Sequence, residues 1–364
     1  MNIMVLKEPN MWFECVELLF RYTNHNDHRT LQGDLIQKYN LEAGTMEDHL
    51  GGIIDLGEFI YNHLETPKER LEFFFGEQGQ QWCYAHMLLM EILHQATYDS
   101  PSQLRQKIAA LSQKDLLMQY AEFLTYSLSD KSANKDLSPL HSELELIQVI
   151  DKFEIDVQKK WQLILLYQNY HIYIEELISI LDQAVSLFQQ QSHLNEPLLT
   201  TFYDSYSSLL QHDPVNYVYE HYQIRLNDNK DIVFAPYIFG CNAVVYFESE
   251  TTSAVQIYIG VHFETISSIV EQNISDERIC KTLKILSDNS KYEILKTIRD
   301  KPAYGQELAE QLNLSTATIS HHMSSLINSG FIKLEKQTNR IYYQMDKEKV
   351  SRFIELLKTN LIPE

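Results

Sequence analysis

The stretch Leu314–Gly330, LSTATISHHMSSLINSG, carries an unusual set of residue types for chemistry at a surface. Between its few apolar residues stand only Ser, Thr, Ala, His and Asn, with no Cys or acid. Hydroxyls and imidazoles both donate and accept hydrogen bonds. This composition therefore predicts a helix with a face of short side chains that forms hydrogen bonds with a polar partner. The alternative is that the same face is simply exposed to solvent. The apolar residues are Leu314, Ile319, Met323, Leu326 and Ile327.

Histidines are the candidate metal ligands. Adjacent residues on a helix point about 100° apart, which argues against a metal pair at His321 and His322. His25–His28 (HNDH) is a second candidate, and His86 with Glu91 and His94 is a third, because residues eight apart share a helical face. Hydrogen-bonded or solvated histidines are much more common, so we predict no metal and no cofactor.

Enzyme signatures are absent from residues 1–275. The sequence lacks G-x-G-x-x-G, G-x-x-x-x-G-K-[ST] and G-x-S-x-G. Two aromatic clusters, Tyr167–Ile174 and Asn216–Tyr222, remain as possible walls of a pocket for a hydrophobic or cationic ligand. Core packing is the more common role of such clusters, and we therefore predict that the protein is not an enzyme.

The amino-acid composition is typical of a soluble globular protein. Hydrophobic residues make up 44% and charged residues 22% of the 364 residues, which excludes a disordered chain. No apolar run approaches the ~20 residues that span a bilayer, and the N-terminus lacks the features of a signal peptide. The four cysteines are far apart, which favours a reducing compartment. These features predict a cytoplasmic protein without a membrane partner.

The net charge of −20 is distributed unevenly. Residues 276–364 hold 14 of the 30 bases and 12 of the 50 acids, a net charge of +2. Residues 1–275 hold the other 16 bases and 38 acids, a net charge of −22. The C-terminal part could therefore approach a polyanion that the rest of the chain would repel.

Apolar periodicity predicts a mainly α fold with a small β component. Helical patterns dominate residues 1–213, including 153–190, which forms one long helix or two joined by a kink. Ser129–Pro139 is the best internal loop. Val- and Tyr-rich runs near 223–262 predict a short antiparallel sheet. We place a domain boundary near 270, which gives an acidic, mostly helical region 1–270 and a C-terminal domain 271–364.

The C-terminal domain shows a sharper pattern. Helical stripes at 276–286 and 290–301 precede a short helix at 304–313. Ser315 caps the helix that follows, and Gly330 ends it. Two alternating runs around Thr338-Asn339 predict a hairpin with a basic tip, and an amphipathic helix covers Lys347–Asn360.

This order resembles the winged helix-turn-helix of ArsR-like bacterial transcriptional regulators. The matching motifs are LSDNSKYEILKTI, ELAEQLNLSTATISHHMSSLINSGFI and QTNRIYYQMD, in the last quarter of the chain. The resemblance implies that a polar helix enters the major groove of double-stranded DNA while a basic wing holds phosphates. The DNA-binding residues it implies are Ser315, Thr316, Ala317, Thr318, Ser320, His321, Lys333, Lys336, Asn339 and Arg340.

Family resemblance also implies a homodimer, formed through 276–287 and 347–360, that reads an inverted repeat as a repressor. The metal-binding Cys of the third helix and His of the last helix, found in many members, are absent here. Region 1–270 faintly resembles uncharacterised N-terminal regions of longer ArsR-like proteins, and we expect it to sense an unknown small-molecule effector or to dimerise. Two alternatives remain: an enzyme that carries a winged helix, and a protein-interaction adaptor.

Overall fold

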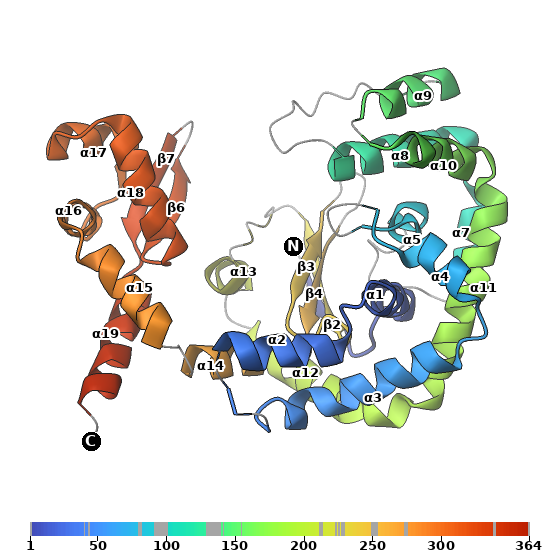
Figure 1. Ribbon diagram of the computed structural model, residues 1–364, viewed down its shortest axis with the longest axis horizontal. Coiled ribbons are helices and arrows are strands. Elements are labelled where there is room, and N and C mark those ends of the chain that lie inside the picture. Colours follow the sequence, from blue (N-terminus) through green and yellow to red (C-terminus); the bar gives the residue numbers. More distant parts are fainter. Residues whose placement is uncertain are drawn as a thin grey trace. The chain divides into compact units, whose positions relative to one another are not determined.

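The chain forms two compact units, Met1–Val270 and Glu271–Glu364, in this computed structural model (Figure 1). It is 68% helical with small sheets, which confirms the predicted mainly α class. The structure describes residues 1–364 except 1, 40, 43, 79–81, 91–100, 129–139, 141, 154, 211–213, 223, 225, 227–229, 249–253, 273–275, 338–339 and 363–364. Only the backbone is described for residues 101–104, 122, 125–128, 192, 216, 220, 271–272, 276–278, 317, 328, 334–337 and 340–341. Among the described helices, none combines the length and apolar character that crossing a membrane requires.

The first unit is built mostly of helices. Its boundary with the second unit falls within the last of them. The predicted loop Ser129–Pro139 lies outside the described residues. The helices are α1 (Met11–Thr23), α2 (His28–Tyr39), α3 (Glu47–His63), α4 (Lys68–Phe75), α5 (Tyr84–Leu88), α7 (Pro101–Ala110), α8 (Gln113–Leu128), α9 (Glu143–Asp151), α10 (Val157–Gln168), α11 (Tyr170–Gln190), the 3₁₀ turn η1 (Ser192–Leu194), α12 (Glu196–Leu209), α13 (Pro214–Tyr222) and α14 (Phe263–Gln272).

Four strands form a sheet in the order β1-β2-β4-β3. They are β1 (Ile3–Val5), β2 (Asp231–Tyr237), β3 (Val244–Phe247) and β4 (Ala254–Gly260). The pair β3–β4 is antiparallel, as the sequence predicts, but β2 pairs in parallel with both β1 and β4. The sheet is therefore mixed. Strand β4 inserts between β2 and β3, and a pattern within one strand does not reveal the direction of its partner.

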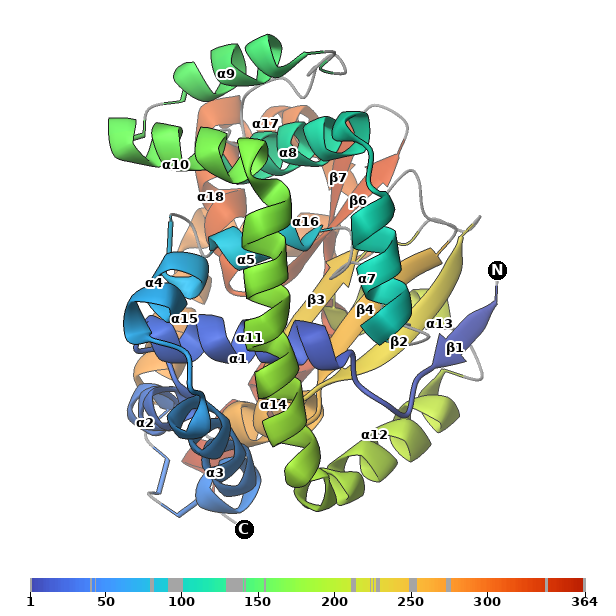
Figure 2. The ribbon, with the colours of Figure 1, turned by 90° about the vertical axis from the view of Figure 1, so that its right-hand side faces the viewer.

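Both faces of this sheet are covered. Alternate residues of β2 point to opposite sides, so Ile232 and Phe234 belong to one core cluster and Val233 to another. Helices α1 and α11 lie on the Val233 side, while α12 and α13 supply the opposite cluster (Figure 2). Burial on two faces explains the continuous apolar run of β2.

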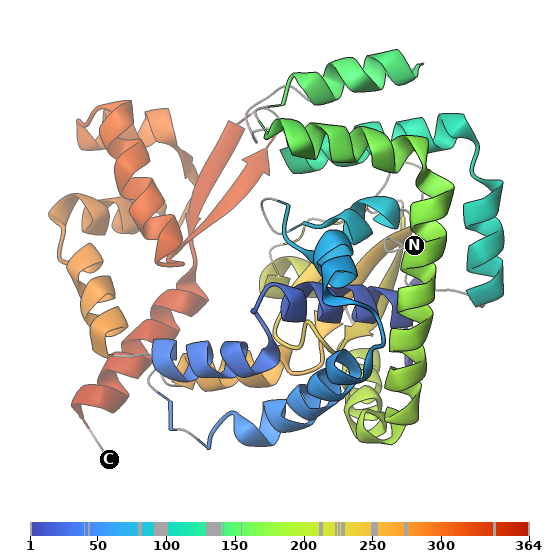
Figure 3. The same ribbon diagram turned by 45° about the vertical axis from the view of Figure 1, so that its right-hand side comes forward.

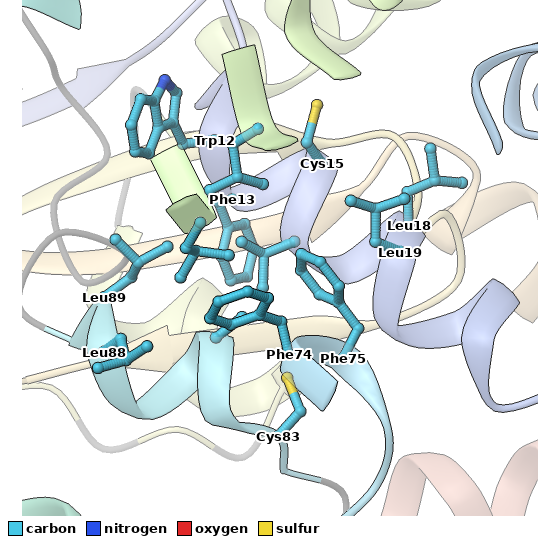
Figure 4. Close-up of a cluster of buried hydrophobic side chains, with 14 of the residues drawn as sticks. Trp12, Phe13, Cys15, Leu18, Leu19, Phe74, Phe75, Cys83, Leu88 and Leu89 are labelled. Atoms are coloured by element: carbon cyan, nitrogen blue, oxygen red, sulfur yellow. The ribbon is translucent and has the colours of Figure 1, made fainter. Parts of the chain in front are cut away.

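Helix α1 forms the centre of the larger cluster. The side chain of Asn10 caps it by accepting the backbone N–H groups of Trp12 and Phe13. Side chains of α1 meet those of α4 and the α5 region in one apolar group, in which Figure 4 labels Trp12, Phe13, Cys15, Leu18, Leu19, Phe74, Phe75, Cys83, Leu88 and Leu89.

A buried carboxyl group fixes the segment that follows β2. The Oε1 and Oε2 atoms of Glu14, which is fully buried in α1, accept the N–H groups of Ile238 (2.7 Å) and Phe239 (2.9 Å). Burial raises the pKa of Glu14 to about 8, although these two hydrogen bonds oppose the shift. The Nε2 atom of His28 donates to the Phe239 carbonyl at 2.8 Å. Helices α1 and α2 thus hold this segment from two sides.

The long helical pattern predicted at 153–190 contains two helices. Helix α10 ends at Gln168, and α11 begins at Tyr170. Asn169 stands between them, and both its backbone N–H and its side-chain amide donate to the Leu165 carbonyl. The side chain thus competes for a helical acceptor and marks the break.

The second unit contains five helices and three strands within its described part. The strands form an antiparallel sheet in the order β5-β7-β6, with β6 and β7 as a hairpin beside α18 (Figure 3). Strand β5, only two residues long, is not predicted by the sequence. The elements are α15 (Asp276–Leu286), α16 (Asn289–Ile298), β5 (Ala303–Tyr304), α17 (Gly305–Leu312), α18 (Thr316–Asn328), β6 (Ile332–Gln337), β7 (Arg340–Met345) and α19 (Lys347–Leu361).

This unit has its own apolar core. Leu308 and Ala309 of α17 are buried. The core also contains Ile279, Ile294, Leu295, Ile298, Ala303, Ile319, Met323, Leu326, Phe331, Ile332 and Phe353. Phe353, within the predicted dimer stripe 347–360, belongs to this core instead, since it is 9% exposed and its ring centroid lies 5.6 Å from that of Phe331.

Candidate nucleic-acid interface

A tight turn joins α17 to α18. Asn313 ends α17 in the left-handed conformation (φ 52°), which Asn tolerates better than most residues. The N–H of Leu314 donates to the Ala309 carbonyl at 2.9 Å. Ser315 then caps α18, and its Oγ accepts the Thr318 N–H at 3.1 Å, as the sequence predicts. The turn fixes where α18 begins.

One face of α18 anchors the helix in the core. Ile319, Met323 and Leu326 are each at most 1% exposed, and they recur at a spacing of three or four residues. Gly330 ends the helix in the left-handed conformation (φ 78°), and its N–H donates to the Ile327 carbonyl. The helix is thus held along its whole length.

The opposite face of α18 is polar and open to solvent. Thr316, Ser320 and His321 are exposed, together with the cap residue Ser315. Ser324 is exposed one turn beyond Ser320, and its hydroxyl donates to the Ser320 carbonyl. The predicted DNA-binding residues do not include Ser324, although its i, i+4 spacing from Ser320 places it on this face.

Two further candidates on α18 differ from these. Thr318 is half-buried, and its Oγ1 lies 2.7 Å from the Ser315 hydroxyl, so its hydrogen-bonding capacity is partly used by the cap. The backbone of Ala317 belongs to the first turn of the helix. Of the predicted residues on α18 and its cap, Ser315, Thr316, Ser320 and His321 are therefore the accessible polar groups, and Ser324 extends the same face.

The hairpin supplies the other candidates. Gln337 pairs with Arg340 and Lys336 with Ile341, so residues 338–339 connect the two strands. The predicted site residue Asn339 lies outside the described residues, and Lys336 and Arg340 are described by their backbone alone. Both of these cationic residues stand within one strand position of the connection.

Lys333 lies near the base of the hairpin. Its Nζ is 3.4 Å from Oδ2 of Asp346, a buried residue that also caps α19 by accepting the Lys349 N–H. The ion pair ties the start of β6 to the start of α19. Lys333 is thus less free to meet an added anion than an unpaired lysine would be.

The candidate metal sites show other contacts. His321 is exposed, whereas His322 is half-buried with its Nδ1 enclosed. His28 bonds to a backbone carbonyl, and His86 bonds to Glu17 and Cys83, while Glu91 and His94 lie outside the described residues. In the part of the chain that the structure describes, no three His, Cys, Asp or Glu side chains are grouped to hold a metal ion.

The aromatic clusters are used in packing and hydrogen bonding. Tyr167 and Tyr170 belong to the core of the first unit. Tyr217 and Tyr222 join Tyr206 in donating to one carboxylate oxygen of Glu264, at 2.9 to 3.3 Å. These hydrogen bonds tie α12 and α13 to the start of α14.

Helices α16, α17 and α18 include a tight turn between the last two, and the exposed face of α18 is polar. Together with the β6–β7 hairpin beside α18, they define a winged helix-turn-helix. Residues 288–333 match the family model "Bacterial regulatory protein, arsR family". The chain belongs to this family, and its C-terminal unit is the DNA-binding domain of a transcriptional regulator.

Curated relatives match the same part of the chain. The arsenical resistance operon repressor of Staphylococcus xylosus is 32% identical over 88 residues, which cover 24% of this chain and 81% of that protein. The CadC homolog of Staphylococcus aureus, a cadmium resistance transcriptional regulatory protein, is also 32% identical over 88 residues and is covered to 71%. No family model matches the rest of the chain.

Solved structures match over a similar share. Reduced HlyU from Vibrio cholerae is 21% identical, with a TM-score of 0.20, and the match covers 24% of this chain and 92% of that one. NolR from Sinorhizobium fredii is 20% identical, with a TM-score of 0.21 and coverage of 23% and 85%.

Proposed function

We propose that the protein is a dimeric repressor that reads an inverted-repeat operator in double-stranded DNA through α18. The observation that carries this proposal is the two-sided character of α18, with Ile319, Met323 and Leu326 buried and a row of hydroxyls and one imidazole exposed. Short side chains let a helix backbone approach base edges in the major groove. Thr316, Ser320 and His321 offer donors, acceptors and a methyl group for base contacts.

The hairpin provides the sequence-independent part of binding. Lys336 and Arg340 flank its connection, where their cationic groups reach phosphates or the minor groove together with Asn339. Lys333 acts mainly by holding the base of the hairpin through Asp346. Ser315, Ala317 and Thr318 position the first turn of α18 against the DNA.

Apolar side chains on the outer helices support the dimer. Leu283 of α15 is 40% exposed, while Ile354 and Leu361 of α19 are 57% and 76% exposed. Ile354 and Leu361 are seven residues apart and so share a helical face. Burial of this face against a second copy would remove it from water and set two α18 helices about one DNA turn apart.

The first unit is proposed to receive the regulatory signal, as a sensing or dimerising region for a small-molecule effector. Its surface charge would keep it away from DNA, since residues 1–275 carry a net charge of −22. A DNA-binding regulator acts where the chromosome lies, which agrees with a cytoplasmic location.

Selection of DNA from a random pool by the full chain tests the proposal. We expect an inverted repeat with half-sites about 10 base pairs apart, bound by two copies with a steep salt dependence. Binding without sequence preference, or with little dependence on salt, would contradict the repressor and favour a protein-interaction adaptor.

A further inference from the structure

Three side chains in the first unit form a connected series that the proposed function does not use. The Sγ atom of Cys83 lies 3.3 Å from Nδ1 of His86, and Nε2 of His86 lies 2.8 Å from Oε1 of Glu17. Glu17 belongs to α1, whereas Cys83 and His86 stand at the start of α5. A thiol next to an imidazole that a carboxylate orients is the arrangement of an activated cysteine nucleophile.

The surroundings of His86 favour its positive form. Burial opposes charge on the ring, but the sulfur of Cys83 and the carboxylate of Glu17 outweigh it and hold the pKa of His86 well above its usual value. Burial likewise opposes charge on Glu17, yet the hydrogen bond and charge of His86, with a hydrogen bond from Tyr237, lower the pKa of Glu17. The imidazolium that forms when Nδ1 of His86 takes the Cys83 proton is therefore stabilised by the carboxylate on its other side.

We propose that Cys83 is a reactive thiol that small hydroperoxides oxidise, with His86 transferring the proton and Glu17 positioning His86. His86 accepts the thiol proton through Nδ1, and the resulting thiolate attacks one peroxide oxygen. The S–O bond forms as the O–O bond breaks, and the leaving hydroxide takes the proton from His86 to become water. Cys83 is oxidised by two electrons to a sulfenic acid and the peroxide is reduced, so thiol and hydrogen peroxide yield sulfenic acid and water.

Access limits the reagent to small molecules. The Cys83 residue is fully buried, whereas the side chains of His86 and Glu17 are 17% and 19% exposed. Solvent thus touches the imidazole and the carboxylate but not the sulfur. The proposal therefore requires that a reagent as small as hydrogen peroxide reaches the sulfur from the side of His86 and Glu17.

A structural role for the pair makes a different prediction. While His86 is neutral, Cys83 and His86 also form a capping box, in which the Cys83 N–H donates to His86 Nδ1 at 3.3 Å and the Cys83 sulfur accepts the N–H of His86. Capping alone would leave the thiol as inert as other buried cysteines. Cys15 and Cys241 provide that comparison, since both are fully buried. Burial raises the pKa of Cys15 well above its usual value and that of Cys241 to about 12.

The experiment measures oxidation of each cysteine within the same folded chain. The reduced full-length protein is exposed to hydrogen peroxide, sulfenic acid is trapped with dimedone, and each cysteine peptide is quantified by mass spectrometry over time. We expect Cys83 to be trapped at least about tenfold faster than Cys15 and Cys241. Equal rates at the three buried cysteines would overturn the proposal. The exposed Cys280 verifies that the reagents are active.

Two variants assign the roles. His86→Gln should slow trapping at Cys83 to the rates of Cys15 and Cys241, and an unchanged rate would refute proton transfer by His86. Glu17→Gln should move the rate–pH profile of Cys83 to higher pH, because the imidazolium loses its carboxylate; an unmoved profile would remove Glu17 from the proposal. His193→Gln, a change at an exposed histidine, is the matched control. If the His86→Gln variant does not fold, the proposal is still tested by the trapping rates of Cys83, Cys15 and Cys241 in the wild type and by the Glu17→Gln variant. The reaction is measured without DNA, so its outcome is independent of the proposed function.

Discussion

The hydroxyl of Ser315 accepts the backbone N–H of Thr318 at 3.1 Å, and the two side-chain oxygens lie 2.7 Å apart. This cap fixes the first turn of α18, the turn that we propose meets the DNA. The same serine would therefore contribute both to stability and to the proposed interface, and the two contributions are separable.

Ser315→Ala should lower the free energy of unfolding of the C-terminal unit by about 1 kcal/mol, because a cap acceptor is lost. Ser315→Asp keeps a good cap acceptor and should keep most of the stability, yet weaken DNA binding by placing a negative charge near phosphates. Thermal unfolding and DNA titration of both variants check this. Equal DNA affinity for wild type and Ser315→Asp would remove the start of α18 from the interface.

Ser320→Ala and His321→Ala should each relax the preference for particular base pairs, by about 1–3 kcal/mol for each lost contact. The measurement compares affinities for the selected operator and for single-base variants. Ser351→Ala removes an exposed hydroxyl from α19 and should change nothing. Equal losses on operator and random DNA would argue against base reading by these residues.

Arg340→Ala should weaken binding to all DNA sequences and reduce the salt slope by about one for each lost phosphate contact. Lys333→Ala should change the slope less, because Lys333 is paired with Asp346. Affinities at several salt concentrations give both slopes. An unchanged slope in Arg340→Ala would remove this arginine from the phosphate contacts.

Ile354→Glu should shift the protein towards monomer, since a charge would have to be buried between two copies. The dissociation constant of the dimer, measured by sedimentation, should rise by at least about tenfold. Thr359→Glu is the control, because five residues along a helix turn its side chain away from the Ile354 face. A monomeric wild type, or equal effects of both variants, would contradict the proposed dimer face.

Stability of the first unit should depend on Glu14. Its pKa is about 8 in the folded chain, above the ordinary 4.5, so the folded state prefers the protonated form. The stabilisation is therefore fully present below pH 4.5 and is lost as pH rises towards 8, by on the order of a few kcal/mol. Glu14→Gln should flatten this decline in melting temperature between pH 4.5 and 8, whereas Glu8→Gln, at an exposed carboxylate, should retain it. Parallel curves for wild type and Glu14→Gln would refute the assignment.

Helix caps and helical spacing are local in the sequence, and the features that depend on them could be predicted. Ser315 and Gly330 stand where helix caps require their side chain or conformation, and the buried stripe of α18 repeats at helical spacing. The features that could not be predicted depend on residues that are far apart in the sequence or on elements too short to carry a pattern. Strand β5 is too short to carry a pattern, and the parallel pairing of β2 depends on β1 from the other end of the unit. The contact of Glu17 with His86 joins residues 69 apart in the sequence.

Position 320 offers the most direct test of the claim that α18 lies against bases. A photo-cross-linking amino acid replaces Ser320 in one variant of the full chain and Ser351 of α19 in a second, and each is irradiated with the selected operator. We expect cross-links to bases within the half-sites from position 320 and none from position 351. No cross-link from position 320 in a chain that still binds DNA, or equal yields from both positions, would contradict it.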